Sequence, residues 1–203
     1  MVPPVRRQRV RTRVVLPLVL AAALVAACAA SVGHVPAALD PSSFGDVLHR
    51  DGVDRLGVED GLVPDGSSPF DDIPALSRLD ADLLDALRAA AADAAQDGIR
   101  LVVTSGWRST RYQQRLYDEA LAEHGSEAGR WAARPGTSVH ETGGAVDLGP
   151  VDAQHWLETY GAGHGLCRTY DNEPWHYELR PEAVSRGCPA TYADASADPR
   201  LQS

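Results

Sequence analysis

Two short stretches of the sequence carry residue types that could bind a metal ion. The stretch "SVHETGGAVDLG" holds His140 and Asp147 on either side of two glycines, and "NEPWHYEL" holds Glu173 and His176. Two histidines and one carboxylate leave a fourth position open on a tetrahedral Zn²⁺, which is typical of a catalytic zinc site. A further carboxylate beside the metal would serve as the general base of a zinc hydrolase.

The glycines of the first stretch could bring its two titratable residues together. In a strand that begins at Gly144, side chains alternate, so Asp147 points away from the apolar residues on either side of it. Gly143 and Gly144 allow a sharp bend that would fold His140 back beside Asp147. The alternative is a half-exposed strand after a glycine turn, with His140 on the loop.

Pro174 decides how the second stretch can work. On a regular strand, Glu173 and His176 would face opposite sides, because they are three positions apart. Proline does not fit a regular ladder in a central strand, so we expect a bulge or turn that lets both side chains converge. Trp175 either forms a wall of the site or fills the core.

The elements that position these residues follow from hydrophobic periodicity and from glycine and proline stops. We expect helices over 79–96, 109–124, 126–133 and 152–160, and strands over 99–105, 144–148, 165–170 and 173–179. Helices grouped before strands, without regular alternation, favour the α+β class. We expect one domain over residues 71–192, which is long enough to bury a core.

Three motifs resemble those of VanY-type zinc D-alanyl-D-alanine carboxypeptidases. The first stretch resembles S-x-H-x-x-G-x-x-x-D, "EPWHYEL" resembles E-P-W-H, and "SGWRSTRYQQRLY" resembles S-G-[YW]-R-S-x-x-x-Q. The resemblance covers about residues 76–181, and the three motifs follow one another in the same order as in the family. It implies a hedgehog/DD-peptidase-like fold, in which helices flank a small antiparallel sheet. Related dipeptidases and L-alanyl-D-glutamate endopeptidases share much of the pattern.

The resemblance also assigns roles to the four residues named first. His140, Asp147 and His176 correspond to the zinc ligands, and Glu173 corresponds to the general base and proton shuttle. We therefore expect removal of the terminal D-alanine from peptidoglycan stem peptides that end in D-Ala-D-Ala. One alternative is an endopeptidase that uses the same site on another bond. The other is a zinc-containing cell-wall binding module without catalysis.

Four further residues have two interpretations each. Arg108 matches the arginine that stabilises the oxyanion or holds substrate, and its alternative is an exposed arginine at a helix start. Gln113 and Ser138 match positions that contact the C-terminus of the peptide, against ordinary surface or turn roles. Glu178 could orient a metal ligand, but we interpret it as a solvated strand residue.

The N-terminus resembles an export signal. Five arginines precede an apolar run that is too short to span a bilayer comfortably, and the run ends in the lipobox-like tetrapeptide "VAAC". We expect a signal peptide over 1–27 and a lipidated Cys28 at the outer face of the cell membrane; the alternative is plain secretion. Residues 28–70 would form a tether and irregular lead-in, and residues 193–203 a C-terminal tail.

The charge balance excludes some partners. Five of the 19 basic residues lie in the leader, which leaves 14 against 28 acidic residues. Such an acidic protein does not fit a general nucleic-acid binder or a polybasic membrane-surface protein. We expect a monomer that contacts the membrane only through a lipid anchor.

Two cysteines remain when Cys28 is set aside. In an exported protein, an isolated pair such as Cys167 and Cys188 is expected to form a disulfide. The alternative is two unrelated reduced cysteines.

Overall fold

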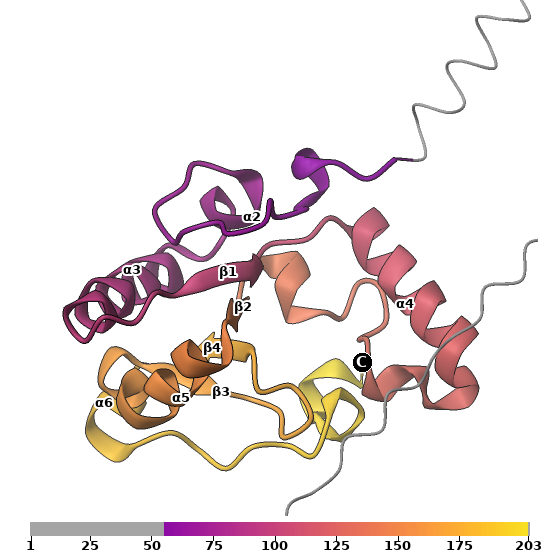
Figure 1. Cartoon of the computed structure of the whole chain (residues 1–203). Helices are drawn as coiled ribbons and strands as arrows, with labels where there is room; N and C mark the ends of the chain where they lie inside the picture. The colour runs from indigo at the N-terminus through magenta and orange to yellow at the C-terminus, as the bar shows by residue number, and fades with distance from the viewer. Residues whose placement is uncertain (1–54, 203) are drawn as a thin grey trace, which may run out of the picture. The chain divides into compact units, whose positions relative to one another are not determined.

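The computed structural model describes residues 55–202, so the expected signal peptide and Cys28 lie outside the described residues (Figure 1). Its helices are α2 (Pro74–Ser77), α3 (Ala81–Gln96), α4 (Thr110–His124), α5 (Val151–Tyr160) and α6 (Ala183–Arg186). Its strands are β1 (Val102–Ser105), β2 (Ala145–Gly149), β3 (Leu166–Arg168) and β4 (His176–Leu179). Within this part of the chain, no helix is long and apolar enough to cross a membrane.

The strands of the described domain form one antiparallel sheet in the order β1-β2-β4-β3. In the register of the central pair, Asp147 lies opposite His176, and Val146 lies opposite Tyr177. Because side chains alternate along a strand, the first pair shares one face and the second pair shares the other. The expected α+β class with a small antiparallel sheet flanked by helices is confirmed.

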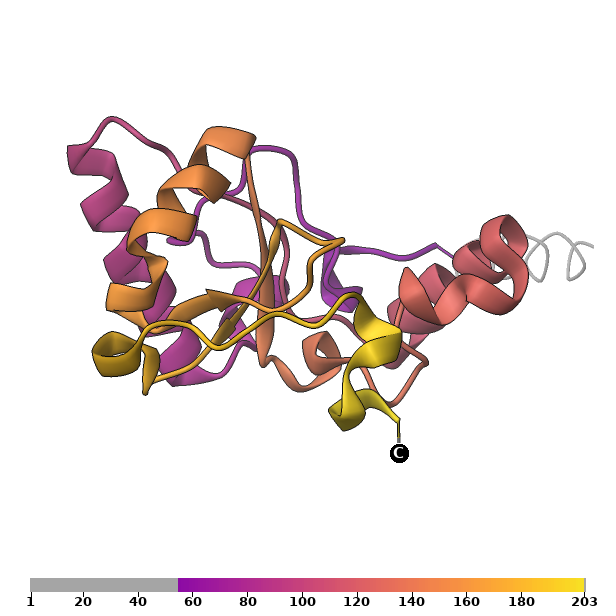
Figure 2. The same cartoon turned by 90° about the horizontal axis from the view of Figure 1, so that it is seen from below.

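The apolar face of the sheet is covered by α3 and α5. Leu83 and Leu87 of α3, Leu157 of α5, and Val146 and Tyr177 of the sheet belong to one buried cluster. The helix α4 lies at the opposite end of the domain from α3 and α5 (Figures 1 and 2). These two helices therefore leave the polar face of the central strands uncovered, and a functional site can form there.

The start of α3 shows how local sequence defines an element. The side chain of Asp80 accepts hydrogen bonds from the backbone N–H groups of Asp82 and Leu83, so it caps a helix that we expected to begin at residue 79. The expected helix over 126–133 is instead a 3₁₀ turn, Gly125–Arg130. The final strand begins only at His176, because residues 173–176 form a turn in which the His176 N–H donates to the Glu173 carbonyl.

Described residues outside both expected boundaries contact the expected domain. In the lead-in, buried Asp60 accepts hydrogen bonds from Ser109 and Arg111 of the α4 region, and Val63 packs on the core. In the expected tail, Asp194 and Asp198 are buried. Polar contacts, and not a periodic apolar pattern, attach these segments on the outer sides of the expected boundaries at residues 71 and 192.

The expected disulfide is present. Cys167 and Cys188 are bonded, with their Cα atoms 5.5 Å apart. Cys167 lies in β3 opposite Glu178 of β4, so the bond holds β4 only through its neighbour β3. The bond closes a loop with a sequence separation of 21.

Replacing both cysteines by serine is expected to lower the free energy of unfolding by about 3 kcal/mol, because the open loop gains chain entropy in the unfolded state. Urea unfolding of the Cys167→Ser/Cys188→Ser protein against the wild type measures this difference. Wild-type protein under a reducing agent should reach the same stability as the variant. A loss below about 1 kcal/mol would show that the loop is constrained by other contacts.

Candidate metal centre and cleft

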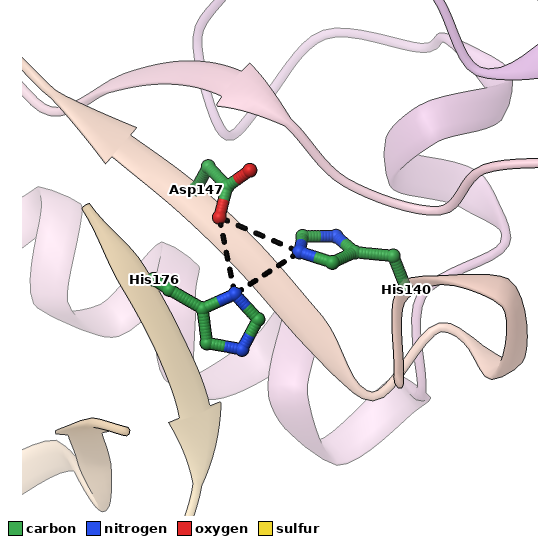
Figure 3. A group of neighbouring side chains, drawn as sticks. All are labelled: His140, Asp147 and His176. Carbon is green, nitrogen blue, oxygen red and sulfur yellow. Dashed lines mark hydrogen bonds and ion pairs between the residues drawn. The ribbon is translucent and has the colours of Figure 1, made fainter. Parts of the chain in front are cut away.

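His140, Asp147 and His176 converge on one point (Figure 3). The Oδ1 atom of Asp147 lies 3.4 Å from His140 Nε2 and 3.3 Å from His176 Nδ1. The two ring nitrogens are 3.1 Å apart. With metal–ligand distances of about 2.0–2.1 Å, neighbouring corners of a tetrahedron lie about 3.3–3.4 Å apart. The triangle of donor atoms therefore has the size of one face of a zinc coordination tetrahedron.

The glycine bend positions His140 as the sequence indicates. His140 lies in the 3₁₀ turn Val139–Thr142, which ends at Gly143 in a left-handed conformation with φ +78°. A Cβ atom at Gly143 would lie 2.3 Å from the Arg78 carbonyl oxygen. Both the backbone angle and the close approach of the α2–α3 connection require glycine here. The alternative of a solvent-facing loop histidine is wrong, because His140 is 2% exposed.

The turn around Pro174 brings Glu173 to the same place. Because β4 starts after the turn, Glu173 is not bound by strand alternation, and its Oε2 atom lies 3.7 Å from His176 Nδ1. The Glu173 side chain is 15% exposed. Together with the three converging residues, it lines a cleft on the surface of the domain. Glu173 thus stands next to the donor triangle without being one of its corners.

In each histidine, the outward ring nitrogen, which points away from the donor triangle, faces a hydrogen-bond acceptor. His140 Nδ1 lies 2.8 Å from the Gly106 carbonyl oxygen, and His176 Nε2 lies 3.4 Å from Glu178 Oε1. A carbonyl or carboxylate can only accept, so each outward nitrogen carries the hydrogen. In the neutral rings the inward nitrogens then present lone pairs to Asp147. Three lone-pair donors that face one another in this way could hold a metal ion, and such outer support is typical of metal-binding histidines.

Burial and the close approach of these charged groups shift the pKa values of all three residues. Burial and the charge of Arg108 lower the pKa of His140 to about 4. Burial also disfavours charge on His176, but hydrogen bonds to Asp147 and Glu178 outweigh it and raise the pKa of His176 to about 9. Although burial opposes it, the histidines hold the pKa of Asp147 well below its usual range. The opposite shifts of the two histidines thus reflect their different partners around the one buried carboxylate of Asp147.

Arg108 is a cleft residue and not an exposed helix cap. Its side chain is 13% exposed, and Nη2 lies 4.0 Å from Asp147 Oδ2. The cap of α4 is supplied by Ser109, whose side chain accepts from the Tyr112 N–H. The Arg108 Nε atom is buried and has no hydrogen-bond partner among the described residues. The guanidinium therefore has unused donor capacity at the cleft.

Gln113 and Ser138 are also buried at the cleft, at 1% and 5% exposed. Gln113 Nε2 donates to the Ala133 carbonyl at 2.8 Å, which fixes the direction of the amide. Its Oε1 atom is buried without a partner in the described part of the chain. Gln113 thus offers an acceptor, which suits a substrate N–H and not a substrate carboxylate. Ser138 has a hydroxyl that can donate.

The interpretation of Glu178 as a solvated strand residue is wrong. Glu178 is 1% exposed, and two arginines as well as His176 contact its carboxylate. These interactions outweigh the effect of burial and hold its pKa far below the usual range. Strand alternation carried the signal, because a residue two positions after His176 lies on the same face of the sheet.

Several other residues around the site were not predicted from the sequence. The Tyr170 ring is buried with its centroid 4.9 Å from that of His176. Trp131, Ala195 and Leu201 line the cleft from the segment after α4 and from the C-terminal segment. Trp175 is 41% exposed and lines the cleft, so it is a wall of the site and not core.

Comparisons with known proteins agree with the geometry. Residues 76–166 match the family model "VanY: D-alanyl-D-alanine carboxypeptidase". The matched segment holds Arg108, His140 and Asp147 and stops before Glu173 and His176. A D-alanyl-D-alanine carboxypeptidase of Enterococcus faecalis (strain ATCC 700802 / V583) is 36% identical over 124 residues. That alignment spans 47% of this chain and 43% of the relative, so the chain covers less than half of the relative's length.

Solved structures share the architecture. The structure described as VanYB in complex with D-Alanine-D-Alanine has 25% sequence identity and a TM-score of 0.52, over 65% of this chain and 87% of its own. The LdcB LD-carboxypeptidase has 22% identity and a TM-score of 0.50, over 64% of this chain and 73% of its own. At that identity, the second likeness is one of fold alone.

Proposed function

We propose, from the premise that residues 76–166 are of the VanY type, that the protein is a zinc-dependent D-alanyl-D-alanine carboxypeptidase. Its substrate would be a peptidoglycan stem peptide that ends in D-Ala-D-Ala, from which it releases the last D-alanine. The observation that carries the proposal is the triangle of three facing donor atoms with Glu173 beside it. The relative from Enterococcus faecalis supports the choice of bond.

Zinc is the metal that this donor set fits best. Two imidazole nitrogens and one carboxylate oxygen are its usual catalytic ligands, whereas Ca²⁺ and Mg²⁺ prefer oxygen ligands. His140, Asp147 and His176 would hold the ion. When bound, Zn²⁺ supplies a Lewis acid that polarises the scissile carbonyl and makes water a better nucleophile at neutral pH.

Glu173 would move the proton. Burial raises its pKa to about 7, although the charge of His176 opposes this shift. A carboxylate with a pKa near the working pH can both accept a proton from the attacking water and donate it to the leaving amine. Its position, with Oε2 3.7 Å from His176 Nδ1, supports this role.

Arg108, Ser138 and Gln113 would orient the substrate. The guanidinium of Arg108, whose Nε has no partner among the described residues, suits the C-terminal carboxylate or the oxyanion that develops during attack, because it is always charged. The Ser138 hydroxyl can donate to the same groups, whereas Gln113 Oε1 suits a peptide N–H. These complementary roles match the two ends of a terminal D-alanine residue.

Product analysis tests the scissile bond. Zinc-loaded protein should convert a pentapeptide stem that ends in D-Ala-D-Ala into a tetrapeptide and an equal amount of free D-alanine, as identified by mass spectrometry. Fragments from the middle of the stem, without free D-alanine, would instead identify an endopeptidase. Tight binding of the peptide without any product would identify a binding module.

We also propose that the protein works outside the cytoplasm. The Cys167–Cys188 disulfide supports this, because such bonds persist in oxidising compartments. Mass spectrometry of the mature N-terminus would test whether export ends in lipidation at Cys28 or in secretion.

A further inference from the structure

The carboxylate of Glu178 stands directly behind the metal-facing ring of His176. Glu178 is 1% exposed, and its Oε1 atom lies 3.4 Å from His176 Nε2 on the side away from the donor triangle. A carboxylate in this place fixes both the ring orientation and the nitrogen that carries the hydrogen. The direction in which His176 presents its lone pair therefore depends on where Glu178 is held.

Two arginines hold Glu178. Arg200 makes a two-pronged contact, with Nη1 2.6 Å from Oε2 and Nη2 3.1 Å from Oε1. Arg180 adds a contact of 2.7 Å from its Nη2 to Oε2. The fork of Arg200 constrains the carboxylate plane, which a single contact cannot do. Arg200 thus sets the rotation of Glu178, although it is 22 positions further along the chain.

Arg200 is itself held by a buried carboxylate that leads back to His176. Asp198 is 0% exposed, and the Nε atom of Arg200 lies 3.0 Å from each of its oxygens. The Tyr170 hydroxyl donates to Asp198 Oδ2 at 3.0 Å, and the Tyr170 ring packs against the ring of His176. The contacts form a closed circuit that begins and ends at His176.

The C-terminal segment that carries this circuit is anchored to the rest of the domain. It consists of the 3₁₀ turns Ala195–Ala197 and Pro199–Leu201, shown in yellow in Figure 2. Arg130 Nε donates to Asp194 Oδ2 at 2.8 Å, which ties the start of the segment to the turn after α4. Buried ionic clusters contribute little net stability, because their desolvation is costly. Such a cluster behind His176 is better explained by positioning.

We propose that Arg200 is a positioning residue of the metal centre, which acts on His176 through Glu178. The proposal rests on the zinc site proposed above and extends it to the segment after residue 193. Arg200 is not among the residues that line the cleft. It keeps the ring of His176 in the one orientation that completes the donor triangle with His140 and Asp147.

Zinc affinity of the metal-stripped protein tests this role. Arg200→Ala is expected to weaken zinc binding about ten- to a hundredfold, as measured by competition with a chromophoric chelator at 25 °C. Arg200→Lys should recover part of the affinity, because it restores the charge without the fork. The matched control is Arg168→Ala, which removes an arginine of similar exposure from β3 that pairs with Glu158 and not with Glu178. The control should bind zinc within about twofold of the wild type.

A merely structural role predicts a different result. Arg200→Ala would then melt at a lower temperature without metal but bind zinc like the wild type in its folded state, and this result overturns the proposal. If Arg200→Ala does not fold, Tyr170→Phe keeps the ring and removes only the hydrogen bond to Asp198. That variant should weaken zinc binding severalfold, and unchanged affinity would overturn the proposal.

The readout needs no peptide substrate, so it separates this inference from the proposed activity. In one outcome, the wild type binds zinc, Arg200→Ala weakens zinc affinity, and the wild type releases no D-alanine. This outcome would contradict the carboxypeptidase function and support the positioning role. In the other outcome, the wild type releases D-alanine and Arg200→Ala keeps full zinc affinity. This outcome would support the carboxypeptidase function and contradict the positioning role.

Discussion

Asp147→Asn is expected to abolish tight zinc binding and to lower kcat/KM for D-alanine release roughly 10³-fold, which corresponds to about 4 kcal/mol. Asp147 is the anionic member of the donor triangle, and its Oδ1 atom is the one that both histidine nitrogens approach. Asparagine keeps the size of the side chain and removes the charge that balances the cation. Zinc content after dialysis and the rate of D-alanine release measure the two effects.

The matched control for this variant is Asp85→Asn. Asp85 is exposed on α3, on a helix that covers the other face of the sheet. The control loses the same charge and should keep both zinc and activity. An Asp147→Asn protein with wild-type zinc affinity would contradict the assignment of Asp147 as a ligand.

Glu173→Gln is expected to lower kcat by about 10²- to 10⁴-fold while zinc stays bound. Glutamine fills the same space but cannot accept a proton, and Glu173 is not a corner of the donor triangle. Steady-state rates together with zinc content separate this effect from that of Asp147→Asn. Glu182→Gln, an exposed position, is the control and should leave both quantities unchanged.

The same residue predicts the pH dependence of the wild type. Glu173 must be ionised to accept a proton, so kcat/KM should rise as the pH increases through its pKa. That pKa is raised to about 7 by burial, and a cation in the donor triangle would favour the carboxylate and lower it. We therefore expect an acid limb with an apparent pKa below 7. If the Glu173→Gln variant showed the same fall of kcat/KM at low pH, with the same apparent pKa, the acid limb would belong to another group.

Local sequence rules predicted the parts of the site that depend on local geometry. Glycine freedom explains the bend at Gly143, and strand alternation explains why Asp147 faces away from the apolar core. The lack of an N–H in Pro174 explains why the strand carrying His176 begins late enough for Glu173 to join the cleft. In each case, the decisive interaction lies within a few residues of the side chain it positions.

The support behind His176 could not be predicted in this way. Glu178 was within reach of the alternation rule, but an acidic residue on a strand is more often solvated than buried. Its burial depends on Arg200, which reaches it from a segment without helical or strand periodicity. Asp60 illustrates the same limit at the other end of the domain, where a polar pair with Arg111 attaches a lead-in that looks like a tether. Long-range ionic contacts leave no periodic trace in a sequence.

The most direct test of the account is a zinc titration of the metal-stripped wild-type protein, with bound zinc and free D-alanine measured at each step. Release of D-alanine from a D-Ala-D-Ala pentapeptide should be absent without metal. It should then rise in proportion to bound zinc and level off at about one ion per chain, as the single donor triangle of the described residues predicts. Full activity in the metal-stripped protein, or zinc binding without release of D-alanine, would contradict the account.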